Sequence, residues 1–299
     1  MKNEDKMIIA VASGKGGTGK TTISVNLARA KSSRIQLLDC DVEEPNTDLF
    51  LNGELIEENI ITIPVPEIDE NKCDGCGECG NFCQYKAIVS YGTKPLVFPE
   101  MCHGCGGCMK VCHNIAISEK NKRIGTVSIR RSENIMLIQG LLDIGVAMAP
   151  PLIRAVKAKM NEENIIIIDA PPGTSCPVIS SLLNSDFILL VTEPTPFGLH
   201  DLKLAVDMVR EIGISFGVIV NRLDAGDDRV SQYCEEEKIP ILMEIPDDRR
   251  IAEAYSLGEL IIDSLPEYRS LFESLLDKIQ KISIIENKEA TIKELSGII

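Results

Sequence analysis

Eight of the eleven cysteines in this chain fall into two runs that share one spacing. The runs read CDGCGECGNFC and CHGCGGCMKVC, and both follow the pattern C-x2-C-x2-C-x3-C. Three thiolates at this spacing clasp three corners of a [4Fe–4S] cluster, and the fourth cysteine points to the other site. The expected ligand sets are therefore Cys73, Cys76, Cys79 and Cys112 for one cluster, and Cys102, Cys105, Cys108 and Cys83 for the other.

Zinc is the alternative metal, because paired C-x2-C motifs also bind it. Two complete runs are more regular than a zinc site requires, which favours iron–sulfur clusters, and their repetition indicates an internal duplication. The segment resembles the bacterial two-cluster ferredoxins, except that Gln84 and His113 follow the fourth cysteines where proline is usual. We expect this departure to affect the reduction potentials rather than the ligation, with His103 and His113 near the clusters or on the surface.

A glycine-rich stretch near the N-terminus has the spacing of a phosphate-binding loop. SGKGGTGKTT follows the apolar run Met7–Val11 and precedes Ile23–Ala30, so it predicts a strand, a loop and a helix. The pattern G-x4-G-K-[ST] turns backbone N–H groups around the phosphates, and adds a lysine for the β- and γ-phosphates and a hydroxyl for Mg²⁺. The expected nucleotide contacts are Gly14, Lys15, Gly16, Gly17, Thr18, Gly19, Lys20, Thr21 and Thr22, with Thr21 also on Mg²⁺.

Carboxylates follow two of the predicted strands. Asp39 and Asp41 come at the end of the run Arg34–Leu38, and Asp169 ends the run Ile165–Ile168. Open α/β sheets bind ligands at the carboxyl ends of their strands, so these side chains are expected beside the phosphate loop. Capping a helix that begins near Asn46 is the alternative role for the first pair.

The phosphate loop carries a second lysine, and GKGGTGKTT resembles the deviant loop of the MinD, ParA, Mrp and nitrogenase iron protein ATPases. The resemblance implies that Lys15 reaches across a homodimer to the partner's nucleotide, so that ATP closes the dimer. It also implies that Asp41, with Asp39 as the alternative, lies in switch I near Mg²⁺ and the attacking water. Asp169 would act on Mg²⁺ through water in switch II. The residues it implies are Lys15, Lys20 and Asp41 for catalysis, and Asn221, Arg222, Pro246 and Asp248 around the adenine.

Three cysteines lie outside the two runs. Cys176 lies seven residues after Asp169, where the nitrogenase iron protein carries one of its two cluster cysteines. The other has no counterpart here, so an interface or packing role is favoured for Cys176, with a bridging metal or transient acceptor site as the alternative. Cys40 and Cys234 are expected to be packed in the interior.

The composition limits the class of protein. The chain has 299 residues, of which 44% are hydrophobic and only 4% aromatic, so aliphatic side chains must fill its core. A formal net charge of −14 disfavours nucleic acid as a partner. No apolar run approaches membrane-spanning length, and the charged start MKNEDK does not resemble a signal peptide. We therefore expect a cytoplasmic protein without a membrane anchor, in which reduced cysteines are available to metals.

Alternating strands and helices predict an α/β fold, with a mostly parallel, doubly wound P-loop sheet built from residues 1–66 and 118–299. Residues 67–117 are expected to form an inserted ferredoxin-like domain, flanked by strands at Ile60–Val65, Lys122–Arg130 and Asn134–Gln139. The resulting hypothesis is a dimeric ATP-hydrolysing switch that uses ATP, Mg²⁺ and two [4Fe–4S] clusters and passes electrons to a partner protein. The alternative is an iron–sulfur or metallocofactor assembly or delivery factor of the Mrp type. A spatial organiser of the ParA or MinD kind would leave the clusters without a role.

Overall fold

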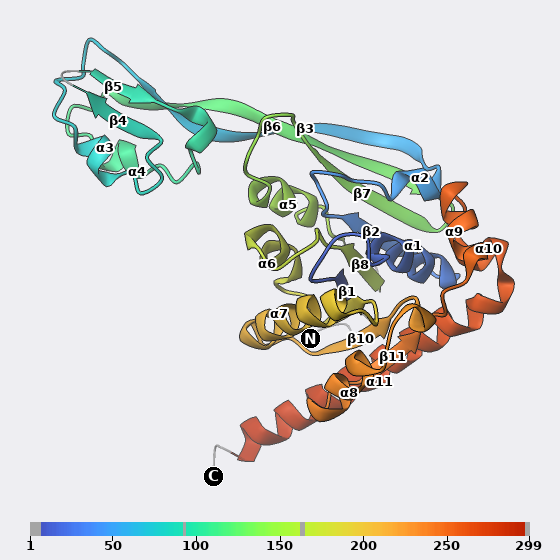
Figure 1. The fold of residues 1–299 in the computed structure, drawn as a ribbon. Coiled ribbons are helices and arrows are strands. Elements are labelled where there is room, and N and C mark those ends of the chain that lie inside the picture. Colours follow the sequence, from blue (N-terminus) through green and yellow to red (C-terminus); the bar gives the residue numbers. More distant parts are fainter. Residues whose placement is uncertain (1–6, 92–93, 162–164, 297–299) are drawn as a thin grey trace.

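One large sheet forms the body of the protein. The computed structural model describes residues 7–91, 94–161 and 165–296 (Figure 1). The strands lie in the order β11-β10-β9-β1-β8-β2-β7-β6-β3, and all pairs from β11 to β7 are parallel. The predicted α/β fold class is therefore confirmed. The strands are β1 (Met7–Ala12), β2 (Ile35–Asp39), β3 (Glu54–Ile68), β6 (Ile117–Ser132), β7 (Ile135–Leu142), β8 (Ile165–Asp169), β9 (Phe187–Thr192), β10 (Phe216–Val220) and β11 (Ile241–Glu244).

Helices cover both faces of this sheet (Figure 1). One face carries α5 (Pro150–Lys157), α6 (Cys176–Leu182), α7 (Pro196–Ile212) and α8 (Arg229–Glu236), and the other carries α1 (Lys20–Ala30), α10 (Ile261–Ser264) and α11 (Arg269–Ser296). The short helix α2 (Asp48–Leu51) follows β2, and α9 (Arg249–Ser256) follows β11.

Each central strand supplies both hydrophobic cores. In β1, Ala10 and Ala12 belong to the core under α5–α8, whereas Ile9 and Val11 belong to the core under α1 and α11. Successive side chains of a strand point to opposite faces, so a strand buried on both faces reads as a continuous apolar run. The run Ile165–Ile168 is the clearest case, because every residue of β8 is buried.

The strands beside the cysteine-rich segment are longer than the sequence predicted. Ile60–Val65 lies within β3, which has 15 residues, and Lys122–Arg130 lies within β6, which has 16. They pair antiparallel from Glu54–Arg131 to Ile68–Ile117, and this β3–β6 ribbon projects from the sheet (Figure 1). The apolar pattern marked only its middle, because charged residues such as Glu57, Glu58 and Lys120 continue the pairing on exposed backbone.

The ribbon carries residues 69–116, the cysteine-rich unit, away from the sheet. The unit contains the helices α3 (Glu78–Phe82) and α4 (Gly107–Val111), a 3-10 turn at Pro99–Met101, and a hairpin of β4 (Ile88–Tyr91) and β5 (Lys94–Val97). Cys79, Ile88 and Ile117 form a small core of their own, separate from the two cores of the main sheet. Two further residues of the unit, Ala87 and Cys102, belong to the core under α5–α8, which also contains Ile63 and Val65 of β3.

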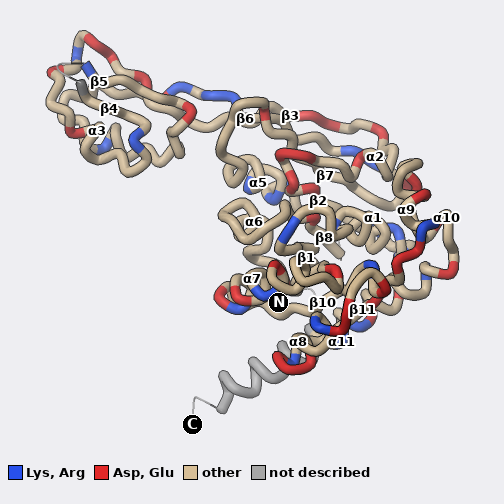
Figure 2. The backbone as a smooth tube through the Cα atoms, viewed as in Figure 1, with Lys and Arg blue, Asp and Glu red and all other residues tan. Residues whose placement is uncertain are grey.

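Charge is spread over the whole molecule. Asp and Glu residues lie on the main body, along the ribbon and on the cysteine-rich unit (Figure 2). Among the described residues, no helix combines the length and the apolar character that crossing a membrane would need.

Candidate functional site

The glycine-rich loop connects β1 to α1 at the carboxyl edge of the sheet. Gly19 has a left-handed backbone with φ 94°, and a Cβ there would lie 2.6 Å from Asn221 Nδ2. Gly14 is also fixed by packing, because a Cβ on it would lie 2.2 Å from the carbonyl oxygen of Asp201 in α7. These close approaches leave no room for a side chain at either position, so the loop needs glycine there to lie against Asn221 and α7.

A cavity of about 410 Å³ opens over this loop and gathers most of the predicted nucleotide contacts. It lies between the loop, the segment after β2 and the segment after β11. The predicted residues that line it are Gly16, Gly17, Gly19, Lys20, Thr21, Thr22, Asp41, Asn221, Arg222, Pro246 and Asp248. The cavity also contains residues that no motif indicated, namely Glu44, Asn46, Pro172, Ile245, Asp247, Ile251, Ala252, Tyr255 and Ile261.

Three carboxylates, those of Asp39, Asp41 and Asp169, lie near the loop. Two of them, Asp41 and Asp169, act on the ammonium group of Lys20. Thr21 Oγ1 donates to Asp169 Oδ2 at 2.7 Å, and Ser24 Oγ donates to the other oxygen at 2.9 Å. Burial raises the pKa of Asp169 to about 7 and that of Asp41 to about 6, with Asp39 contributing to both shifts. Burial also lowers the pKa of Lys20, although Asp169 and Asp41 oppose this shift.

This donor set fits a hard divalent cation. Mg²⁺ prefers a few carboxylate and hydroxyl oxygens together with water and phosphate, and Thr21, Asp41 and Asp169 offer such oxygens beside the loop. The buried Thr18 Oγ1 has no hydrogen-bond partner within the described part of the chain, so the loop also holds a polar atom that a ligand could satisfy.

Asp39 binds the segment that follows β2 rather than the phosphate loop. Its Oδ2 accepts hydrogen bonds from Thr47 Oγ1 at 2.7 Å and from the backbone N–H groups of Asn46 and Thr47, each at 3.2 Å. Its Oδ1 accepts from the N–H of Asp41 at 3.1 Å. Asp39 thus shapes the loop that presents Asp41 and leads into α2, which begins at Asp48 rather than near Asn46.

The four residues that are predicted to surround the adenine line the same cavity. They are Asn221, Arg222, Pro246 and Asp248. Asn221 Nδ2 donates to the Thr18 carbonyl oxygen at 2.9 Å, so it ties the end of β10 to the phosphate loop. Asp248 caps α9 through the N–H of Arg250 and accepts from Tyr268 Oη at 3.0 Å. Hydrogen bonding with Arg250 holds the pKa of the Asp248 carboxyl below its usual range. Base contacts from these residues stay a prediction.

Lys15 is not among the residues that line this cavity. Its Nζ lies 3.1 Å from Glu193 Oε2, and Arg222 Nη1 donates to Glu193 Oε1 at 2.9 Å. The sequence patterns did not indicate Glu193. Its position directly after β9 was the available signal, because that strand also ends at the ligand-binding edge of the sheet.

The cysteine-rich unit holds two cavities, each lined by four cysteines that come from both runs. The cavity of about 20 Å³, site 1, is lined by Cys73, Cys76, Cys79 and Cys112. The cavity of about 70 Å³, site 2, is lined by Cys83, Cys102, Cys105 and Cys108. The structure therefore brings together the same two crossed sets that the spacing predicts.

Burial keeps several thiols of these sites in the neutral form. Burial raises the pKa of Cys79 and Cys102, and it raises the pKa of Cys108 to about 11. Without a metal these thiols stay protonated at neutral pH, and cluster binding would displace their protons. Four cysteines lining one cavity supply the number of thiolate ligands that a cubane cluster takes.

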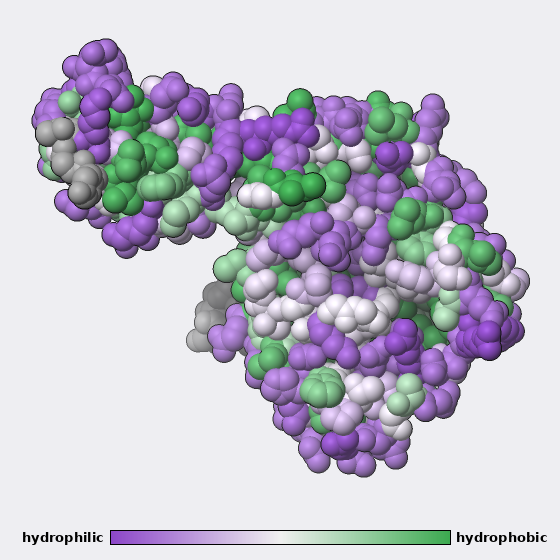
Figure 3. Space-filling model, turned by 45° about the horizontal axis from the view of Figure 1, so that its top comes forward, coloured by the Kyte–Doolittle hydropathy of each residue, from purple (hydrophilic) through white to green (hydrophobic). Residues whose placement is uncertain are grey.

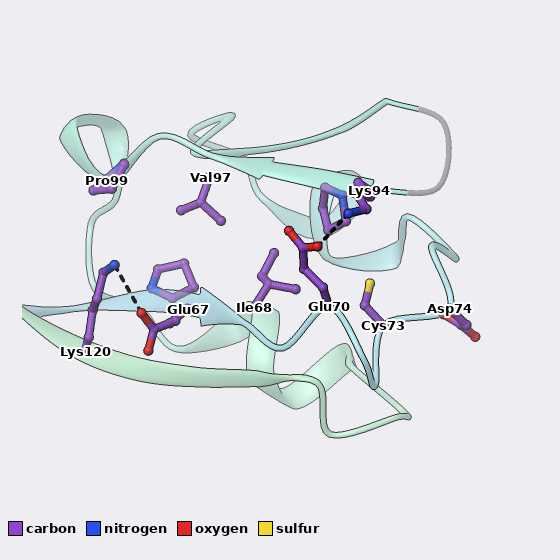
Figure 4. A pocket seen from close by; sticks show the side chains of 11 residues that line it. Glu67, Ile68, Glu70, Cys73, Asp74, Lys94, Val97, Pro99 and Lys120 are labelled. Atoms are coloured by element: carbon purple, nitrogen blue, oxygen red, sulfur yellow. Dashed lines mark hydrogen bonds and ion pairs between the residues drawn. The ribbon is translucent and has the colours of Figure 1, made fainter.

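A larger cavity of about 390 Å³ lies beside site 1, between the end of the ribbon and β5 (Figure 4). Ile68 and Val97 form its apolar wall, and Cys73 lies at one end. Two ion pairs also line the cavity: Lys94–Glu70 at 2.5 Å and Lys120–Glu67 at 3.3 Å. All four charged side chains are more than half exposed, so these pairs contribute little to stability.

The remaining cysteines differ in access. Cys176 is exposed at the start of α6, at the edge of a shallow hollow that Arg154 and Met160 also line. Cys40 and Cys234 are buried, as expected for packed residues. Burial raises the pKa of both thiols, and that of Cys234 reaches about 11.

Comparison with known proteins agrees with this architecture. Residues 9–261 match the model of the CobQ/CobB/MinD/ParA nucleotide binding domain. An uncharacterised protein of Methanocaldococcus jannaschii is 35% identical over 85% of this chain and 91% of its own length. An iron–sulfur cluster carrier protein of Aquifex aeolicus is 29% identical over 88% of this chain and 63% of its own length.

Among solved structures, the septum site-determining protein MinD of Pyrococcus horikoshii, complexed with Mg-ADP, has the same fold. Its TM-score is 0.57 at 22% sequence identity, and the match covers 94% of this chain and 98% of the MinD chain. The phosphate loop, the two carboxylates beside it and the family match lead to one assignment: the chain belongs to the CobQ/CobB/MinD/ParA family of nucleotide-binding proteins and is a P-loop ATPase.

Proposed function

We propose that this ATPase is a dimeric switch that carries two [4Fe–4S] clusters and couples its nucleotide cycle to electron transfer to a partner protein. The observation that carries the proposal is the crossing of the cysteine runs, since each of two cavities in one unit takes cysteines from both runs. A crossed pair of complete four-cysteine sites favours electron passage over cluster release, because all eight cysteines of the two runs are used as ligands and none of them is left open to an acceptor.

The nucleotide half of the proposal follows from the cavity over the phosphate loop. The backbone N–H groups of Gly16–Thr21 and the Lys20 ammonium would bind the phosphates of ATP, and Thr21 and Asp169 would hold Mg²⁺. Asp41 lines the same cavity and would orient the attacking water. Mg²⁺ would neutralise the charge that develops on the phosphates.

The dimer half of the proposal rests on Lys15. This lysine lies outside its own cavity, so its ammonium is available to a nucleotide bound in a second copy once Glu193 releases it. ATP would then join two subunits, and hydrolysis would separate them. Residues 67–117 would serve as the inserted ferredoxin-like domain that exchanges electrons with the partner.

The test uses anaerobically prepared full-length protein. We expect iron and sulfide at the stoichiometry of two cubane clusters, an EPR signal after reduction by dithionite, and formation of a dimer with a non-hydrolysable ATP analogue. In a complex with a captured electron acceptor, ATP should raise the rate of cluster oxidation. If the rate of cluster oxidation does not depend on ATP, and if Lys20→Ala shows the same rate as the wild type, the coupling of the nucleotide cycle to electron transfer is rejected.

A second candidate function is cluster assembly or delivery, which the similarity to an iron–sulfur cluster carrier protein favours. In this case Cys176, the exposed cysteine after switch II, would hold a labile cluster between two subunits. Replacing Cys176 by serine separates the candidates. A delivery factor should lose iron transfer to an apo-acceptor, whereas an electron-transfer switch should keep its iron content and its ATP-dependent cluster oxidation.

A further inference from the structure

Each four-cysteine site is joined across the two runs by one side-chain contact. We infer that these contacts, Asp74 with His113 at site 1 and His103 with Tyr85 at site 2, position the fourth cysteine that each site borrows from the other run. The inference rests on the proposed function, because it takes both sites to hold clusters.

The two halves of the unit have the same backbone. Each run continues into a five-residue helix, α3 or α4, that ends one residue before the fourth cysteine. Lys86 and Ile115, three residues after the fourth cysteines, have left-handed backbones with φ 56° and 51°. Since the backbones repeat, the difference between the sites must come from their side chains.

At site 1 the joining contact is polar. Asp74 Oδ1 accepts a hydrogen bond from the N–H of Cys76 at 3.1 Å, which shapes the loop of the first run. Asp74 Oδ2 lies 3.1 Å from Nε2 of His113, the residue that follows Cys112 in the second run. The other ring nitrogen of His113 lies 3.7 Å from Glu78 Oε2. Asp74 therefore connects the loop that supplies three thiols to the segment that supplies the fourth.

At site 2 the joining contact is aromatic. The residue equivalent to Asp74 is His103, and it stacks on Tyr85, with ring centroids 3.5 Å apart and planes inclined by 13°. Tyr85 lies two residues after Cys83, the borrowed cysteine. Phe82 adds a contact between the same runs, since a Cβ on Gly107 would lie 2.2 Å from Phe82 Cε1. The same task is performed here by ring packing instead of a hydrogen bond.

These contacts matter because a borrowed ligand has no help from the tight loop that holds the other three. The fourth cysteine lies at the end of a short helix, and its thiol stays in place only if the following residues do. Residues that orient metal ligands typically change affinity 10- to 100-fold when they are replaced.

A different reading of site 1 is a mononuclear metal site. Asp74, Cys76 and His113 each offer a ligand atom, and these atoms lie within 4.8 Å of one another. Cys76 also lines the four-cysteine cavity, and one thiolate cannot serve both sites in full. The crossed cavity favours the cluster, with Asp74 and His113 as positioning residues.

The contacts also make the two sites unequal. Site 1 is lined by Asp74, Glu78 and His113, whereas site 2 has the half-exposed rings of Phe82 and Tyr85 at its rim together with His103 and one carboxylate, Glu119. Hydrophobic residues gather on the surface of the cysteine-rich unit among hydrophilic ones (Figure 3). Cluster potentials depend on nearby charge and solvent access, so two separate potentials are expected.

The test measures cluster loss from each site separately. The anaerobic full-length protein is exposed to a ferrous-iron chelator, freed thiols are alkylated, and the labelled peptides are identified by mass spectrometry. In His113→Ala, labelling of Cys73, Cys76, Cys79 and Cys112 should become about tenfold faster, with site 2 unchanged. His113→Gln, whose amide can donate to Asp74, should restore the wild-type rate. Lys110→Ala, exposed on α4, is the matched control and should behave as wild type.

The reciprocal pair tests site 2. Tyr85→Leu should speed labelling at Cys83, Cys102, Cys105 and Cys108, while Tyr85→Phe keeps the stack and the protection. Wild-type labelling rates in both His113→Ala and Tyr85→Leu would overturn the inference. So would a His113→Ala variant that loses clusters equally from both sites, if His113→Gln does not restore the wild-type rate. A wild-type protein without iron, or with one zinc at Asp74, Cys76 and His113, would instead reject the proposed clusters, so the two failures are distinguishable.

Discussion

Glu193 binds Lys15 with one carboxylate oxygen and Arg222 with the other. The distances are 3.1 Å and 2.9 Å, and the Glu193 side chain is only 10% exposed. The contact joins the phosphate loop to the segment after β10, which also lines the cavity. Lys15 is thus held inside its own chain, and in the proposed dimer it would have to leave Glu193 to reach the second subunit.

Replacing Glu193 by glutamine should favour the dimer. The substitution removes the charge that holds Lys15 and keeps the shape of the side chain. We expect the concentration of a non-hydrolysable ATP analogue needed for dimer formation to fall by about fivefold, a typical coupling between two sites. Size-exclusion chromatography with light scattering measures it. Lys15→Ala should stay monomeric with the analogue, and a Glu193→Gln variant that needs more nucleotide than wild type would contradict the holding role.

Replacing Lys20 by alanine should abolish tight ATP binding. Lys20 is buried beside Asp169 and Asp41, where water screens its charge poorly. Loss of a buried charge partner costs about 100-fold or more in affinity. Isothermal titration with Mg-ATP tests this, with the exposed Lys238→Ala as the control. Wild-type affinity in Lys20→Ala would show that the phosphates bind elsewhere.

Metal-free protein should lose stability as the pH rises from acidic to neutral. The pKa of Asp41 is raised to about 6 and that of Asp169 to about 7, so the unfolded chain releases these protons first. The free energy of unfolding therefore falls between about pH 4 and about pH 7 and stays lower above that interval. Mg²⁺ needs the deprotonated carboxylates, so its affinity should rise over the same interval.

Urea unfolding in the presence of a chelator, at about pH 5 and about pH 7.5, measures this difference. Burial raises the pKa of Asp39 as well, so Asp41→Asn removes one of three titrating carboxyls and should make the pH dependence shallower. A variant with the wild-type pH dependence would mean that Asp41 does not contribute to it.

The three cysteines outside the runs should differ in how fast their thiols are labelled. In the anaerobic cluster-loaded protein we expect iodoacetamide to label Cys176 first, because it is exposed. Cys40 and Cys234 should stay unlabelled until the protein unfolds, since burial blocks access and raises their pKa. Peptide mass spectrometry gives the order. Early labelling of Cys234 would indicate that α8 opens in the native state.

Adding a methyl group at Gly140 should destabilise the sheet. A Cβ there would lie 2.6 Å from Val42 Cγ1 and 2.8 Å from Val156 Cγ2, so α5 would have to shift. Overpacking of this kind costs about 1–3 kcal/mol, measured by denaturant unfolding of Gly140→Ala. The neighbouring Leu141 is 52% exposed, and Leu141→Ala should change stability by less than about 1 kcal/mol.

Local patterns predicted the parts of this protein that depend on short-range geometry. The phosphate loop needs its glycines and lysine at fixed offsets, so Lys20 and Thr21 were identifiable from spacing alone. The same holds for the crossed cysteine sets, because the C-x2-C-x2-C-x3-C run leaves its fourth thiol out of reach of its own loop. The fully buried β8 was visible as an unbroken apolar run.

Contacts between distant segments were not predictable in the same way. Glu193 meets Lys15 only because β9 pairs beside β1, and nothing near either residue indicates the other. The stack of Tyr85 on His103 depends on how the two halves of the cysteine-rich unit face each other. The length of β3 and β6 was missed because paired backbone, rather than an apolar pattern, extends them.

The length of the β3–β6 ribbon sets the distance between the cysteine-rich unit and the main sheet. Inserting two residues into each strand would displace the cysteine-rich unit by about 7 Å and preserve which face each side chain takes. Neither the phosphate loop nor the eight thiols would change. In the proposed electron-transfer switch, the length of this spacer would therefore set how far the clusters extend toward an electron acceptor, independently of both sites.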